Sequence, residues 1–73
     1  MTISEIREQL LHVDAEFQKL VEEHARYSSQ LQQISRTPYL SAEDLLLESE
    51  LKKLKLRLKD EMERRVAEYR QAS

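Results

Sequence analysis

A single proline interrupts a chain that otherwise contains no strong breaker of helices. Pro38 lies among small hydroxyl residues near the middle of the sequence, and none of the 73 residues is glycine. Proline lacks a backbone N–H and disfavours a helical conformation at the residue before it. The sequence therefore predicts one domain with a helix over 3–35, a turn over 36–41 and a second helix over 42–70.

The apolar residues of the first predicted helix recur at alternating spacings of three and four. His24 fills the one gap in this stripe, which consists of Ile3, Ile6, Leu10, Val13, Phe17, Leu20, Tyr27, Leu31 and Ile34. Such a 3.5-residue repeat keeps a narrow apolar stripe facing a partner helix, as in coiled coils. Thr2 and Glu5 have the spacing of a capping box, which marks a helix start. These signals predict a long, continuous helix.

The second predicted helix starts at Ser41, a favourable N-cap residue followed by Glu43 and Asp44 in the first turn. Its apolar stripe is Leu47, Leu51, Leu54, Leu58, Met62, Val66 and Tyr69. The spacings within this stripe slip from the strict heptad near the middle, which locally unwinds a supercoil. Opposite charges four residues apart, such as Glu48 and Lys52, favour a helix over a strand.

Two amphipathic helices with a short connection fold back on each other in antiparallel fashion. A chain this short buries only a modest part of its surface, so one hairpin is a weak core. Further apolar residues lie outside the two main stripes: Leu11, Val21, Leu45, Leu46 and Leu56. We therefore expect an all-α, coiled-coil-like, antiparallel two-helix hairpin. We also expect these five residues to form the interface between two copies of the hairpin, which together make a homodimeric four-helix bundle.

The second helix also resembles a known family. The segment from Leu51 to Met62 reads Leu-Lys-Lys-Leu-Lys-Leu-Arg-Leu-Lys-Asp-Glu-Met. It is similar to the signature of the YdcH-like family of small bacterial proteins of unknown function. That signature is Leu-Lys-Lys-x-Lys-Leu-x-Leu-Lys-Asp-Glu followed by an aliphatic residue. The resemblance extends more loosely back to Phe17, and Tyr27-Ser28 replaces the Leu-Asp that the family usually carries. It implies a small cytoplasmic helical hairpin and no particular activity.

Composition excludes several functional classes. The absence of cysteine removes disulfides, thiolate metal sites and cysteine nucleophiles, and the absence of glycine removes phosphate-cradling loops. His12 and His24 lack metal-ligand spacing, so we expect no metal and no cofactor. The carboxylates have cations one turn away, so we expect neither an enzyme nor a small-molecule substrate. The longest apolar run is Leu45–Leu47 and no signal peptide is evident, so we expect a cytoplasmic protein.

Two features remain as candidate sites. Five basic residues lie within eight positions without an acid among them: Lys52, Lys53, Lys55, Arg57 and Lys59. They are interpreted either as solvated, ion-paired flanks of the apolar stripe or as a face for nucleic acid or an anionic membrane. His24 is a polar residue of the seam. We expect it to be neutral and to bond across the hairpin to Arg57, Asp60 or a backbone carbonyl, fixing the register.

The leading functional hypothesis is a protein–protein interaction or structural module that associates with itself and with an unidentified protein partner. Its apolar helix faces would supply affinity, and the flanking charges would select the partner. The alternative is an accessory protein that binds nucleic acid or an anionic surface through Lys52–Lys59. Acids and bases nearly cancel, giving a formal net charge of −2, so no global field draws the chain to nucleic acid.

Overall fold

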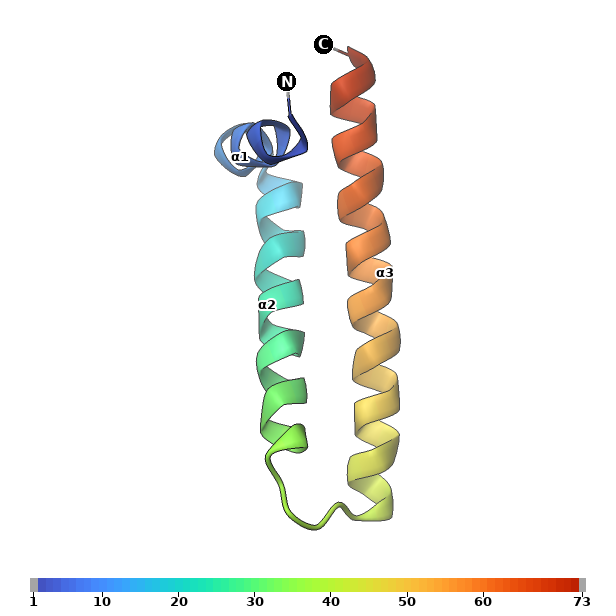
Figure 1. Cartoon of the computed structure of the whole chain (residues 1–73). Coiled ribbons are helices and arrows are strands. Elements are labelled where there is room, and N and C mark those ends of the chain that lie inside the picture. Colours follow the sequence, from blue (N-terminus) through green and yellow to red (C-terminus); the bar gives the residue numbers. More distant parts are fainter. Residues whose placement is uncertain (1, 73) are drawn as a thin grey trace.

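The computed structural model describes residues 2–72, so the end residues of the expected domain, Met1 and Ser73, lie outside it. This part of the chain forms three helices: α1 (Ile3–Val13), α2 (Ala15–Ser35) and α3 (Ala42–Ala72). Helices α2 and α3 run side by side in opposite directions, and α1 lies across their far end, near both termini (Figure 1). The fold is all-α, as predicted, and has extents of 49 × 20 × 16 Å.

The continuous helix expected over 3–35 is wrong, because the chain bends at Asp14. The backbone of Asp14 is extended, with φ −118° and ψ 104°. Its carboxylate accepts the backbone N–H groups of Glu16 and Phe17 at 3.0 and 3.2 Å, so it caps the start of α2. The same carboxylate pairs with Arg65 of α3 at 2.9 Å. These interactions replace one straight helix by two.

The other helix starts follow the predicted capping chemistry. Thr2 and Glu5 form the complete capping box of α1, which confirms that expectation. At α3, the Ser41 hydroxyl accepts the backbone N–H of Asp44 at 3.1 Å, and the Asp44 carboxylate accepts that of Ser41 at 3.1 Å. The linker between α2 and α3 contains Pro38, and α3 runs two residues beyond the expected end at position 70.

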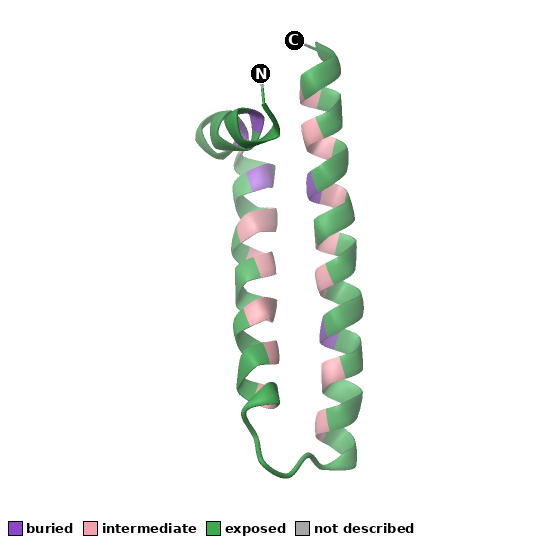
Figure 2. Cartoon of the chain, in the orientation of Figure 1, coloured by how far each residue is buried: buried purple, intermediate pink, exposed green. Residues whose placement is uncertain are grey.

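The bend determines where the core lies. Helix α1 places Ile6 and Leu10, which are 1% and 3% exposed, against Phe17 and Met62. Partly buried apolar side chains surround this cluster: Leu20, Val21, Val66 and Tyr69. Burial is concentrated at the α1 end of the rod, and towards the linker the outer faces are exposed (Figure 2). A three-helix cluster at one end therefore holds the fold together.

The bend also changes which apolar residues of α1 are buried. Ile3 and Val13 belong to the predicted stripe but are 58% and 72% exposed. They were expected to face α3 along a straight helix, and the change of direction at Asp14 turns them to solvent.

The buried stripe of α3 keeps five of its seven predicted members: Leu51 and Met62 are buried, and Leu58, Val66 and Tyr69 are half-buried. Leu47 and Leu54 were expected in the seam but are 49% and 40% exposed. Lys55 and Arg65 are also half-buried on α3, so two long basic side chains lie among the apolar residues of the stripe.

Truncation of Phe17 tests this placement of the core. Phe17→Ala removes the ring on which α1 rests, and we expect a loss of about 3–5 kcal/mol in the free energy of unfolding. Val13→Ala, at an exposed apolar position, is the matched control and should change it by less than about 0.5 kcal/mol. Urea unfolding at low protein concentration measures both. Equal effects of the two substitutions would contradict the core described above.

Candidate functional site

Large apolar side chains are more often exposed than buried in this structure. Five are buried, and ten are exposed over residues 2–72. Six of the exposed ones are leucines at or after the linker: Leu40, Leu45, Leu46, Leu47, Leu54 and Leu56. Exposed large apolar side chains gathered on one part of a small protein are candidates for an interaction site. We call these six leucines, five on the first half of α3 and Leu40 in the linker, the leucine surface.

The five residues expected at a partner interface divide between two environments. Leu45, Leu46 and Leu56 are 53%, 64% and 59% exposed and belong to the leucine surface. Leu11 of α1 is 39% exposed, at the other end of the rod. Val21 is half-buried and packs against the core cluster.

Sequence reasoning missed the other members of the leucine surface. Leu47 and Leu54 were assigned to the seam, and Leu40 was given no place in an interface. The number of leucines was the available signal that some of them must be exposed. The three neighbouring residues Leu45–Leu47 point in different directions around a helix, and one partner helix covers only one of those directions. Tyr39 in the linker is 89% exposed.

The five basic residues of 52–59 do not form one face. Lys52 and Lys55 line a groove between α2 and α3, and Lys59 lines a second groove nearer α1. Arg57 lies in a different depression with Asp60, Glu61 and Arg64, and Lys53 is exposed without a place in any of these hollows. Helical geometry distributes them, because successive residues are turned by about 100°.

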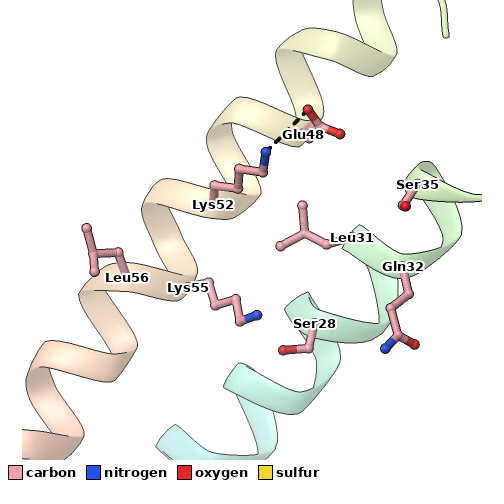
Figure 3. Close-up of a pocket in the computed structure, with 8 residues that line it drawn as sticks. All are labelled: Ser28, Leu31, Gln32, Ser35, Glu48, Lys52, Lys55 and Leu56. Atoms are coloured by element: carbon pink, nitrogen blue, oxygen red, sulfur yellow. Dashed lines mark ion pairs between the residues drawn. The ribbon is translucent and has the colours of Figure 1, made fainter.

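The first groove has a volume of about 620 Å³ and is open to solvent. Lys55 reaches across towards Ser28 and Leu31 of α2, while Leu56 points away from α2 (Figure 3). Lys52 pairs with Glu48 at 3.5 Å, which confirms the ion pair expected from their spacing. Ser28, Gln32 and Ser35 supply neutral polar groups on the α2 side. This groove combines positive charge with hydroxyl and amide groups.

The second groove lies between α1 and the C-terminal half of α3, with a volume of about 670 Å³. Its lining includes the apolar side chains of Ile3, Met62 and Val66. It also includes the cations Arg7 and Lys59 and the carboxylate of Glu63. No ion pair joins Arg7, Lys55 or Lys59 to a carboxylate within residues 2–72. These three cations are therefore available to an external anion.

His24 lies within electrostatic reach of these three cations. It is half-buried on α2, and burial lowers the pKa of its imidazole, with Lys55, Arg7 and Lys59 lowering it further. The hydrogen bond expected across the hairpin is absent from the described residues, and Arg57 and Asp60 lie at the other depression. The interpretation of His24 as a neutral seam residue agrees with this environment, but the proposed partners were wrong, because α3 turns Lys55 and Lys59 towards it.

Other chemistry is not evident in the described residues. Residues 2–72 contain no group of three or more His, Asp or Glu side chains placed to hold a metal ion. Within the same range, no helix combines the length and apolar character needed to cross a membrane.

The environment of His24 predicts a pH dependence of stability. Its pKa is lowered in the folded state, so the unfolded chain binds a proton more readily. Stability is then retained above the ordinary histidine pKa, near 6.5, and falls as the pH drops through it.

We expect the thermal midpoint to decrease between pH 7.5 and 5.5, and His24→Leu to reduce that decrease. Thermal unfolding of both proteins at the two pH values measures the difference. His12→Leu is the control, since this exposed histidine lies outside the seam. An equal decrease in all three proteins would contradict the burial of His24.

Comparison with known proteins identifies a family without a known activity. No curated protein and no solved structure matches the chain. The family described as "Protein of unknown function (DUF465)" matches residues 17–66, which begin at Phe17 and take in most of α2 and α3. Helix α1 precedes the matched region. Because the match covers more than half of the sequence, the chain belongs to this family of uncharacterised proteins.

Proposed function

We propose that this protein is a non-enzymatic interaction module that associates with itself through its exposed apolar helix faces. The observation that carries the proposal is the excess of exposed over buried large apolar side chains, ten against five over residues 2–72. Covering apolar surface is favourable by about 25 cal/mol per Å². Every other copy of the chain carries the same leucine surface. Packing two copies together through this surface is therefore the simplest way to cover it.

A symmetric dimer suits this surface. Leu45 and Leu56 are about three helical turns apart on the same side of α3, so two α3 helices can pack against each other there with α2 of each copy on the outside, as a four-helix bundle. Glu43 and Glu50 flank Leu47, and Lys52 lies beside Leu56. Such flanking charges favour some orientations of the two helices over others. An additional protein partner would dock on whichever helix face the dimer leaves free.

Substitution within the leucine surface tests self-association. Leu45 and Leu56 are about half exposed, so replacing both with serine should leave the fold intact. We expect the dissociation constant of the oligomer to rise at least about tenfold. Sedimentation equilibrium over a range of concentrations measures the change. Replacing Lys52, Lys53 and Lys55 with glutamine is the control, and this variant should keep its oligomer.

A wild-type chain that stays monomeric up to millimolar concentration would refute the proposal. Circular dichroism of each variant would show whether a loss of mass reflects dissociation or unfolding.

The cations around His24 favour a second candidate function, which is binding of an anionic group such as a phosphate. Arg7, Lys55 and Lys59 come from two helices and have no ion pair among the described residues. A phosphate bound there would offset the charges that lower the His24 pKa. The binding would weaken steeply with added salt.

Titration with inorganic phosphate and with a short RNA tests this alternative. We expect a bound anion to raise the pKa of His24, observed through its ring proton resonances at low salt. A variant carrying both Lys55→Gln and Lys59→Gln should lose the response. If neither ligand changes the His24 titration at low salt, this alternative is excluded.

A further inference from the structure

Helix α1 covers the most apolar surface of the α2–α3 pair. Beneath it, Phe17 is fully buried and Met62 is 6% exposed. Leu20, Val21 and Val66 border this surface and remain partly exposed. Without α1, these side chains would form one continuous apolar face at the end of the rod. In this structure it is covered by one short helix of 11 residues.

The sequence is compatible with a second position for α1. The apolar repeat runs through the bend without interruption, since Leu10, Val13 and Phe17 are spaced by three and four. A helix continued through Asp14 would return Val13 and Ile3 to the same stripe as Leu20. In the bent form these two residues are 72% and 58% exposed, so only part of the apolar repeat is buried.

The helix lengths fit such a straight form. Helix α3 has 31 residues and α2 has 21, so α3 is longer by ten residues, or roughly 15 Å. The surplus of α3 extends past the start of α2 (Figure 1). Helix α1 has 11 residues, roughly 16 Å, and would cover this surplus if it continued in line with α2.

Few interactions hold the bend. Asp14 caps α2 and pairs with Arg65. The Gln18 side-chain amide of α2 donates to the Leu11 carbonyl of α1, and the Tyr69 hydroxyl donates to Gln9 at 2.5 Å. The Arg65 Nε is buried without a hydrogen-bond partner, which is unfavourable. Burial of Ile6 and Leu10 is the main gain of bending, and a second copy that covered the same face would supply an equivalent gain.

We propose that the face beneath α1 is the contact surface for a second copy of this chain, and that α1 and that copy compete for it. In the monomer α1 folds across the face. In the dimer α1 continues in line with α2, and two straight hairpins pack as a four-helix bundle through the exposed faces. This inference rests on the proposed self-association through the leucine surface. It adds the face beneath α1 as a second contact and names α1 as the helix that must move.

A proline substitution at position 15 is compatible with the bent form and incompatible with the straight form. Ala15 is the first residue of α2 and follows the capping residue, a position where proline is well tolerated. The extended backbone of Asp14, with ψ 104°, also suits the residue before a proline. In a continuous helix the same proline would break the backbone hydrogen bonding. Ala15→Pro should therefore keep the bent monomer and exclude the straight form.

The matched control is Ala42→Pro. Ala42 is the first residue of α3 and follows Ser41, which caps that helix, so proline occupies an equivalent position. Both forms contain this helix start, and the control should dimerise like the wild type. We expect Ala15→Pro to weaken dimerisation at least about a hundredfold in sedimentation, with its circular dichroism preserved.

A distance measurement reports the position of α1 directly. The chain has no cysteine, so spin labels can be placed at Ser4→Cys and Glu22→Cys, both exposed. In a straight helix these backbone positions are about 27 Å apart, and the bend shortens the distance. We expect the longer distance to appear as protein concentration is raised through the dimerisation range, and Ala15→Pro to abolish it.

The outcomes separate the two proposals. A dimer that forms equally in the wild type and Ala15→Pro, or without a change in the label distance, overturns this inference and leaves self-association intact. A wild type that is monomeric at every concentration overturns both.

Discussion

The carboxylate of Asp14 determines the architecture of this small protein. By accepting the backbone N–H groups of Glu16 and Phe17, it starts α2 in a new direction and turns α1 back across the α2–α3 pair. Hydrogen bonding to Phe17 lowers the pKa of this carboxyl, partial burial opposes the change, and Arg65 adds to the lowering. The carboxyl group is thus held in the charged form that caps α2. Because of this cap, the chain forms three helices over residues 2–72 in place of the two that were predicted.

The sequence predicted where helices start better than it predicted the direction in which each helix runs. The capping residues Thr2 and Ser41 and the interruption at Pro38 are local signals, and local hydrogen bonding determines them. The bend was missed because the apolar repeat continues through it, and a heptad pattern alone indicates a straight helix. Asp14 followed by Glu16 was the available signal for a new helix start. The burial of Ile6 and Leu10 in the tertiary structure favours the bent form over a straight helix.

The apolar stripe of α3 shows a second limit of periodicity. This helix carries more leucines than two neighbouring helices can cover, so the pattern identifies an apolar helix without specifying which residues face inward. Lys55 and Arg65 are half-buried, while Leu47 and Leu54 are exposed. For the same reason the expected basic face was divided between separate hollows, and the cations around His24 were recognised only from the fold.

The uneven placement of the core implies that the rod is not equally stable along its length. Four of the five buried apolar residues belong to the cluster at the α1 end, and Leu51 is the only other one within residues 2–72. Local opening is easiest where few apolar contacts must be broken. Helices α2 and α3 should therefore separate from each other first at the linker and last beside Phe17 and Met62. A protein built in this way can open its loop end to another helix while α2 and α3 stay packed at the opposite end.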